Sequence, residues 1–201
     1  MNTSPSTKAH PLHDTKRMGF SKECELKTTP AMRPMSDFLI TEINEDSWPQ
    51  ILQIQAEVYV DIEPESLVTL RSKWQNSPEC CFLCVTEQGV CAYLLAHAWH
   101  SESPPKLYQP APASPQGDVL FIHDLAVSKR VAGMGVGTQM VSHLLNSAQA
   151  RGFRNALLVA VQDSVPFWQK FGFQSRKDSP PNPFYGNSAV VMQRHLHDQL
   201  N

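Results

Sequence analysis

The stretch "AGMGVGTQMVSHLL", residues 132–145, decides how the rest of the sequence is interpreted. It places a glycine at every second position, at Gly133, Gly135 and Gly137, and then continues with the apolar spacing of a helix. Glycine inside a regular element costs about 0.5–1 kcal/mol relative to alanine. We therefore expect a specific need for bare backbone at this point.

The segment before the glycines predicts a buried strand. Residues 119–127, "VLFIHDLAV", are apolar on both faces apart from His123 and Asp124. A helix that begins directly after a glycine-rich turn leaves its first backbone N–H groups without partners. The helix dipole adds partial positive charge there, and the missing Cβ atoms let a phosphate approach closely. The stretch indicates an anion cradle, and the alternative is a tight strand-to-helix crossing without a ligand.

Periodicity and turn residues predict a mixed α/β sheet with helices on both faces. Strands are expected over residues 37–43, 80–87, 90–99, 119–127, 155–161, 172–176 and 188–196. Helices are expected over residues 46–59, 63–76, 137–151 and 163–171. The predicted order is β-α-α-β-β-β-α-β-α-β-β. Ser47 or Asp46 is expected to cap the first of these helices, and the Pro-rich residues 100–118 read as a long loop.

Composition limits the class of protein. The chain has 201 residues, of which 41% are hydrophobic and 18% charged, as in soluble globular proteins. Residues 1–36 lack periodicity and read as a disordered basic tail, so the ordered domain is expected over residues 37–197. A net charge of −2 argues against a nucleic-acid binder. Without an apolar run near the length of a membrane span or a secretory signal, we expect no membrane partner and a cytoplasmic location.

The cysteines do not indicate a metal or disulfide framework. The chain has 5 cysteines, an odd number in a chain that does not resemble a small secreted protein. Cys81 and Cys84 have the spacing of half a zinc site, but they lie in a predicted strand, where residues three apart point to opposite faces. We therefore expect no metal ligands here.

Two motifs together resemble the GNAT superfamily of acetyl-CoA-dependent N-acetyltransferases. They are "LAVSKRVAGMGVGTQMVSHLL", residues 125–145, and "SVPFWQKFGF", residues 164–173. The resemblance covers roughly residues 37–195. It implies one domain with a mixed, mostly antiparallel sheet, helices on both faces, a splayed central strand, and acetyl-CoA as co-substrate.

The family's glycine motif, Arg/Gln-x-x-Gly-x-Gly/Ala, fits in two registers. Residues 130–135 match by residue type, whereas residues 132–137 match by distance from the strand, and we adopt the second. This register puts Ala132 where the family has Arg or Gln, so Arg130 or Lys129 would have to supply side-chain support. The resemblance implies a cofactor site formed mainly by backbone, with an aromatic ring on its far side: Leu125, Ala126, Val127, Ala132, Gly133, Met134, Gly135, Val136, Gly137, Thr138 and Trp168.

Within the superfamily, "IHDLAV" and "VPFWQKFGF" look most like the arylalkylamine (serotonin-type) N-acetyltransferases. In those enzymes a histidine two residues before the Leu of "LAV" acts as base, which implies that role for His123. Their proposed acid is a tyrosine where this chain has Trp168, and Tyr185 is the candidate that could replace it. Asp124 is the rival base, or the group that holds the tautomer of His123. Its side chain should point to the opposite face of the strand unless the strand is bulged.

The chemistry of amine acetylation explains these residue types. A primary amine has a pKa near ~10, so a base is needed to produce the neutral, attacking form at pH 7. Histidine titrates in a suitable range, and a general base is typically worth ~10²–10⁴-fold. The amine is cationic before it reacts, so carboxylates and aromatic faces should line its site. Candidates from the segment "EVYVDIEPE" and the end of the hairpin are Glu57, Tyr59, Asp61, Glu63, Trp99 and, near the same cleft, His97 and His100.

The sequence therefore predicts an acetyltransferase for a small-molecule primary amine, acting as a monomer or homodimer. Two alternatives remain open at this point. The acceptor can be the amine of a protein or peptide, which would call for an open groove. The departures at Ala132 and Trp168 also leave open a non-catalytic, CoA-binding regulatory domain.

Overall fold

A computed structural model describes residues 38–60, 63–112, 117–177, 185–186 and 188–196. The expected basic tail, residues 1–36, lies outside the described residues. The strands are β1 (Leu39–Glu42), β2 (Phe82–Thr86), β3 (Gly89–Trp99), β4 (Val119–Val127), β5 (Asn155–Ala160), β6 (Gln174–Ser175) and β7 (Val190–His195). The α-helices are α1 (Trp48–Val58), α2 (Leu67–Asn76), α3 (Val136–Ala150) and α4 (Val165–Gln169). Their order along the chain is the order predicted from the sequence.

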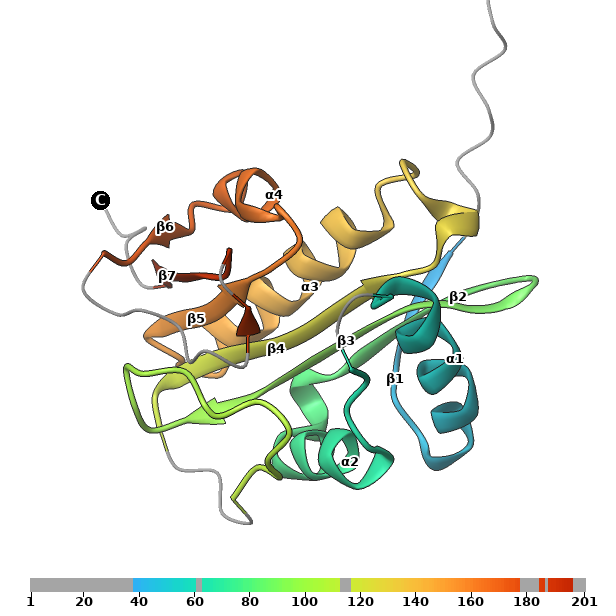
Figure 1. The fold of residues 1–201 in the computed structure, drawn as a ribbon, viewed down its shortest axis with the longest axis horizontal. Helices are drawn as coiled ribbons and strands as arrows, with labels where there is room; N and C mark the ends of the chain where they lie inside the picture. Colours follow the sequence, from blue (N-terminus) through green and yellow to red (C-terminus); the bar gives the residue numbers. More distant parts are fainter. Residues whose placement is uncertain (1–37, 61–62, 113–116, 178–184, 187, 197–201) are drawn as a thin grey trace, which may run out of the picture. The chain divides into compact units, whose positions relative to one another are not determined.

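The described strands form one 7-stranded sheet in the order β1-β2-β3-β4-β5-β7-β6. All neighbouring strands are antiparallel except β4 and β5, which are parallel. Helices α1 and α2 lie on one face of the sheet and α3 on the other (Figure 1). The predicted mixed, mostly antiparallel architecture with helices on both faces is confirmed. None of the described helices is long and apolar enough to cross a membrane.

The central strand β4 separates from β5 halfway along its length. The pairing of β4 with β5 covers Val119–Ile122 only, whereas β4 continues to Val127 beside β3. The two strands therefore splay apart after Ile122. This gap, at the end of two parallel strands, is where an open α/β sheet can admit a ligand.

A bulge in β4 lies at the same point. In the β3–β4 register Leu95 is opposite Asp124 and Ala96 is opposite Ile122, so His123 is an extra residue in β4. The extra residue changes which face each following side chain takes. His123 and Asp124 consequently both reach residues on the α1–α2 side of the sheet. The expectation that they point to opposite faces is therefore wrong, for the reason that the sequence analysis left open.

Local signals explain the helix boundaries, with one correction. The side chain of Ser66 accepts a hydrogen bond from the Thr69 N–H at 3.2 Å and caps α2. Helix α1 has no such cap at Ser47. Instead a 3₁₀ turn, Glu45–Ser47, precedes it and is capped by Asn44, which accepts from the Asp46 N–H at 3.0 Å. The predicted cap position at Ser47 is thus confirmed, but the side-chain capping bond is made earlier, at Asn44, because the chain begins to turn there.

Three apolar clusters form the core of the described residues, and the two larger ones lie on opposite faces of the sheet. Cys81 packs with residues of α1 and α2, and Cys84 packs with residues of α3. The two cysteines therefore face opposite sides of the sheet, as the strand alternation predicts.

Candidate active site

A cavity of about 200 Å³ lies beside β4 where β4 and β5 part. Its lining comes from the end of α1, the segment leading into α2, the bulge of β4, helix α4 and the segment before β7. Among the lining residues are Tyr59, Glu65, His123, Asp124, Trp168 and Tyr185. Of the sequence-predicted catalytic residues, the fold thus brings His123, Asp124 and Tyr185 to one cavity.

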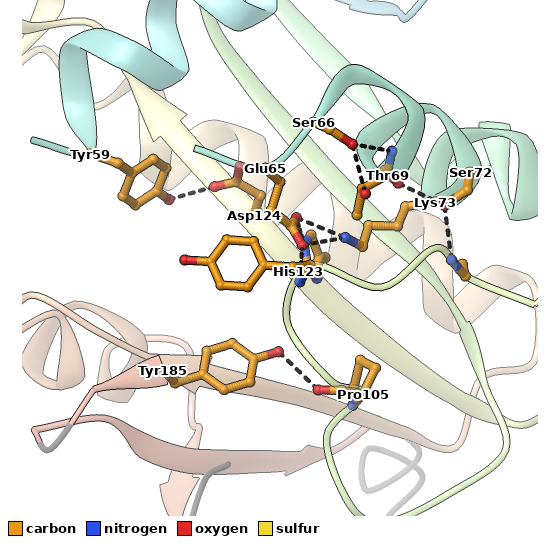
Figure 2. A network of polar contacts seen from close by, with 12 residues as sticks. Tyr59, Glu65, Ser66, Thr69, Ser72, Lys73, Pro105, His123, Asp124 and Tyr185 are labelled. Atoms are coloured by element: carbon orange, nitrogen blue, oxygen red, sulfur yellow. Dashed lines mark hydrogen bonds and ion pairs between the residues drawn. The ribbon is translucent and has the colours of Figure 1, made fainter. Parts of the chain in front are cut away.

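Glu65 is the centre of a buried polar network at this cavity (Figure 2). Its Oε2 lies 2.5 Å from Nε2 of His123. The ammonium of Lys73 donates to both carboxylate oxygens, at 2.9 Å and 2.7 Å, and the Tyr108 N–H donates to Oε1 at 2.7 Å. Burial alone would raise the pKa of Glu65, but His123 and Lys73 together lower it from 4.5 to about 2. Glu65 is therefore a carboxylate at neutral pH.

Asp124 has a separate set of partners on the same side of β4. Its two carboxylate oxygens accept hydrogen bonds from the hydroxyls of Tyr59 and Tyr93, each at 2.5 Å. Burial raises the pKa of Asp124, although both hydrogen bonds oppose this effect. Burial also raises the pKa values of Tyr59 and Tyr93 well above their ordinary range, so both remain donors.

A second histidine, His97 on β3, lies fully buried beside His123, with 6.3 Å between the ring centroids. Its Nδ1 is 3.0 Å from the carbonyl oxygen of Ala98. Burial lowers the pKa of His97 from 6.5 to about 4. His97 is therefore neutral at physiological pH and is part of the core, not of the cavity lining.

The Pro-rich segment after β3 is anchored to the rim of the cavity. Besides the Tyr108 bond to Glu65, the Ala111 N–H donates to Oγ of Ser72 at 2.8 Å, and Asn76 donates to the Pro112 carbonyl at 2.7 Å. On the other side, the Tyr185 hydroxyl donates to the carbonyl of Pro105 at 3.1 Å (Figure 2). Leu107, from the same segment, lines the cavity. The segment thus joins α2 to the residues before β7 across the site.

The glycine turn adopts the geometry of an anion cradle. Gly135 is the N-cap of α3. Among the described residues, the backbone N–H groups of residues 135–138 have no hydrogen-bond partner, as expected for a helix start. Gly133 and Gly135 have φ values of +76° and +82°, and a Cβ on either would meet no atom within 4 Å. Open space and unpaired donors therefore meet at the start of α3.

A family model described as "Acetyltransferase (GNAT) family" matches residues 48–173 of this chain. The match spans both the splayed strand and the glycine turn. The chain belongs to the acetyltransferase (GNAT) family. No curated protein sequence matches the chain significantly.

Solved structures share this GNAT fold at low sequence identity. Ard1 from Thermoplasma volcanium matches with a TM-score of 0.62 and 18% identity, over 79% of this chain and 97% of that one. Naa50 from Arabidopsis thaliana, solved with the bisubstrate analogue CoA-Ac-MVNAL, matches with a TM-score of 0.59 and 14% identity, over 78% and 97%. The loading GNATL domain of CurA from Lyngbya majuscula matches with a TM-score of 0.68 and 10% identity, over 80% and 98%. At these identities the likeness shows the fold alone.

Some residues predicted to bind the acceptor in this GNAT domain lie elsewhere. The carboxylate of Glu57 accepts from the Ser128 hydroxyl and, at 2.7 Å, from the Lys129 N–H, so it fastens α1 to the turn after β4. The Trp99 indole donates to the Ser103 carbonyl at 2.8 Å, outside the cavity. Helical phase explains Glu57: the α1 residues that line the cavity are Gln55 and Val58. Neither Glu57 nor Trp99 thus lines the cavity, and their roles in binding the acceptor stay predictions.

The other predicted residues divide as follows. Tyr59 and Glu63 line the cavity, and Asp61 lies outside the described residues. Arg130 does not support the glycine turn, because its guanidinium donates to carbonyls of the β2–β3 turn, including that of Val90. Lys129 contributes its backbone N–H to Glu57.

Sequence reasoning missed Glu65 and Lys73. One signal for Lys73 was present, because it follows Leu70 by three positions and thus falls on the buried stripe of α2. A lysine on an apolar stripe calls for a buried partner. Nothing local in the sequence identified Glu65 as that partner.

Proposed function

We propose that this chain transfers the acetyl group of acetyl-CoA to a primary amine of a small molecule, by direct attack of the neutral amine on the thioester. Membership of the acetyltransferase (GNAT) family supports acyl transfer. The observation that carries the small-molecule acceptor is the anchored Pro-rich segment, which joins α2 to Tyr185 across the cavity. A peptide acceptor would be better served by an open groove.

The residues present fit acetyl-CoA as co-substrate. The unpaired N–H groups of residues 135–138 and the dipole of α3 suit a pyrophosphate. The unpaired edge of β4 beyond Ile122 offers backbone groups of residues 125–127 to an extended arm. When bound, acetyl-CoA supplies the acetyl group as an activated thioester. Trp168 lines the same cavity and supplies an aromatic wall.

His123 is the group that we assign as base. It takes one proton from the acceptor ammonium, directly or through a water molecule, and the neutral amine nitrogen then attacks the thioester carbonyl carbon. The new N–C bond forms as the C–S bond breaks, and the electron pair leaves with sulfur as a thiolate. The attacking nitrogen then loses its second proton, which neutralises the thiolate, so that the products are the amide and the free thiol. A thiol with a pKa like that of cysteine, about 8.5, leaves without a strong acid. Hence Trp168 at the position of the family's tyrosine is compatible with turnover.

Asp124 and Tyr185 are less suited to proton transfer. Both oxygens of Asp124 are occupied by tyrosine hydroxyls. The hydroxyl of Tyr185 donates to Pro105, and burial raises its pKa, which makes it a poor acid. We propose that Tyr185 shapes the cavity and that Asp124 holds Tyr59 in place there.

The residues that line the cavity also favour one class of amine as the acceptor. Glu63 and Glu65 line the cavity, and so do the apolar side chains of Leu107, Phe167 and Trp168. A cationic group attached to an apolar or aromatic body fits this combination. Arylalkylamines are therefore the first substrates to test, in agreement with the sequence resemblance.

The deciding experiment measures thiol release from acetyl-CoA with arylalkylamines, polyamines, amino acids and short peptides. We expect release to depend on a small amine, and we expect His123→Ala to lower kcat/KM by ~10²–10⁴-fold, the usual worth of a general base. His195→Ala, at the exposed end of β7, is the matched control and should behave as wild type.

Other outcomes would redirect the proposal. Release that requires peptides would assign a peptide acceptor. Saturable acetyl-CoA binding without release for any amine would indicate a CoA-binding regulatory domain. Full activity of His123→Ala would remove His123 as the base.

A further inference from the structure

The carboxylate of Glu65 already accepts hydrogen bonds through both oxygens and is therefore not free to act as a base. Its carboxylate accepts from Lys73 through both oxygens, from the Tyr108 N–H through Oε1, and is bonded to His123 through Oε2. The Lys73 and Glu65 side chains are 1% and 6% exposed, so solvent does not compete for these bonds. A carboxylate surrounded by donors in a buried site stays ionised.

The ionised state of Glu65 determines which nitrogen of His123 carries hydrogen. A carboxylate can only accept, so the 2.5 Å contact with Nε2 requires an N–H on that atom. In a neutral imidazole the other nitrogen, Nδ1, then carries the lone pair. Nδ1 is buried and has no hydrogen-bond partner among the described residues. Four other buried side-chain atoms of the described residues, including Nε2 of His97, also lack a partner, so the assignment of the lone pair to Nδ1 rests on the contact of Nε2 with Glu65.

The neighbouring His97 does not offer an alternative base. Its low pKa makes it a weak base, although its Nε2, like Nδ1 of His123, is buried without a partner among the described residues. His97 is also absent from the lining of the cavity, whereas His123 belongs to it.

We infer that Glu65, held by Lys73, is a positioning residue that fixes His123 in the tautomer with hydrogen on Nε2, so that Nδ1 carries the lone pair of the imidazole. The His123 side chain is 2% exposed, so Nδ1 accepts the proton of the amine once the bound amine, or a water molecule beside it, reaches this atom. This inference rests on the proposed function for its last step. The fixing of the tautomer stands on the geometry of Glu65, Lys73 and His123. When Nδ1 takes the proton, the imidazolium keeps its Nε2–H bond to Glu65, and the carboxylate stabilises the positive charge.

Replacing Glu65 by glutamine tests the inference sharply because it conserves volume. The amide oxygen would turn toward the two donors, Lys73 and the Tyr108 N–H, since an amide NH₂ there would meet only hydrogen atoms. The NH₂ group would then take the place of Oε2, face Nε2 of His123 and donate to it. At that place it would also face the ammonium of Lys73, which has to turn toward the amide oxygen. The hydrogen of the imidazole would move to Nδ1, and the base would be lost although the fold is kept.

The first arm is spectroscopic and needs no substrate. In the full chain labelled with ¹⁵N-histidine, long-range ¹H–¹⁵N correlations at slightly alkaline pH report which ring nitrogen is protonated, and His123→Gln identifies the signals of His123. We expect hydrogen on Nε2 in wild type and in the control Glu42→Gln, an exposed residue of β1, and hydrogen on Nδ1 in Glu65→Gln. Hydrogen on Nδ1 in wild type, or an unchanged tautomer in Glu65→Gln, would overturn the inference.

The second arm is kinetic. With an amine that the wild type acetylates, Glu65→Gln should lower kcat/KM for that amine by ~10²–10⁴-fold and leave the KM for acetyl-CoA unchanged. Wild-type activity in this variant would overturn the role of Glu65. If the wild type acetylates no amine, the proposed function fails, and the spectroscopic arm still decides whether Glu65 sets the tautomer.

A variant without the unpaired buried charge allows both the spectroscopic and the kinetic measurement even if Glu65→Gln is unstable. Glu65→Gln leaves the ammonium of Lys73 buried without its carboxylate, which can destabilise the fold. The double variant Glu65→Gln/Lys73→Met removes both buried charges and keeps the amide opposite Nε2. We expect the same tautomer on Nδ1 and the same loss of activity as in the single variant.

Discussion

At the scale of single residues, two buried carboxyl groups beside His123 differ in their partners. Glu65 is bonded to a cation, to a backbone N–H and to the histidine, whereas Asp124 is bonded to two tyrosine hydroxyls. Lys73 and His123 lower the pKa of Glu65, and burial raises that of Asp124. The contact with His123, followed by the contact with Lys73, thus makes Glu65 the firm electrostatic partner.

Buried His97 makes the stability of the fold depend on pH. Its pKa falls from 6.5 in the unfolded chain to about 4 in the fold, so the unfolded chain binds this proton first as pH falls. We expect the free energy of unfolding to drop by about 3 kcal/mol from this group between pH 6.5 and pH 4. Glu65 adds a second loss of the same sign between pH 4.5 and pH 2, because its pKa is also lowered in the fold.

Urea unfolding at a series of pH values checks this dependence. His97→Gln removes the titrating group and should flatten the curve between pH 6.5 and pH 4, whatever its own stability at pH 7. The exposed control His195→Gln should keep the wild-type slope. An equal slope in His97→Gln and wild type would contradict the prediction.

At the scale of elements, glycine occupies the three positions of the turn for different reasons. Positive φ values explain Gly133 and Gly135, because a residue with a Cβ is strained in that conformation. Gly137 lies in the first turn of α3, where its φ requires no glycine, and a Cβ on it would meet Val127 at 3.5 Å and Phe167 at 3.6 Å. Those are ordinary contacts. The fold without a ligand therefore does not require glycine at position 137.

Gly137→Ala should separate stability from binding. We expect it to stabilise the fold by up to about 1 kcal/mol, the gain of alanine over glycine in a helix. We also expect it to weaken acetyl-CoA binding by about tenfold or more, because the added methyl group lies between Val127 and Phe167, beside the proposed path of the cofactor. Thermal unfolding and calorimetric titration with acetyl-CoA measure the two effects.

The matched control, Gly152→Ala, should have the opposite effects, with a less stable fold and unchanged binding of acetyl-CoA. Gly152 follows α3 at a φ of +84°, far from the turn along the helix, and a Cβ there would meet nothing. Gly152→Ala should therefore cost about 1 kcal/mol of stability and leave binding unchanged. If Gly137→Ala binds acetyl-CoA as tightly as wild type, the cradle lies elsewhere.

The order of helices and strands was predictable because it depends on local periodicity. The contact between Glu65 and His123 was not, because it depends on tertiary packing. Residues 119–127 read as a strand from apolar runs alone, and residues 136–150 as a helix from their stripe. Glu57 lies at the end of α1 and Glu65 just before α2, and only tertiary packing gives one to Ser128 and the other to His123. The bulge at His123 likewise depends on β3, its neighbour in space.

At the scale of the whole molecule, the segment after β3 connects parts of the site that are distant in sequence. Its contacts with Ser72 and Asn76 attach it to α2, and its contact with Tyr185 attaches it to the residues before β7. Tyr108, on the same segment, reaches Glu65 with a φ of +64°, which a tyrosine adopts only when its surroundings hold it there. Closure of the cavity and anchoring of Glu65 are therefore coupled.

Ser72→Ala tests this coupling with little risk to the helix. The Ser72 hydroxyl accepts from the Ala111 N–H at 2.8 Å and donates to the Thr69 carbonyl within α2 at 2.6 Å. Alanine is the better helix former, which offsets the loss of the second bond, so the loss of the anchor should dominate. A hydrogen bond worth about 1 kcal/mol predicts a KM for the amine about fivefold higher, with the KM for acetyl-CoA unchanged, and faster proteolysis within residues 104–112. Ser142→Ala, on the exposed face of α3, should leave all three quantities as in wild type. Faster proteolysis without a change in KM would mean that the segment covers the cavity but does not help to hold the amine, and the coupling between closure and Glu65 would then be wrong.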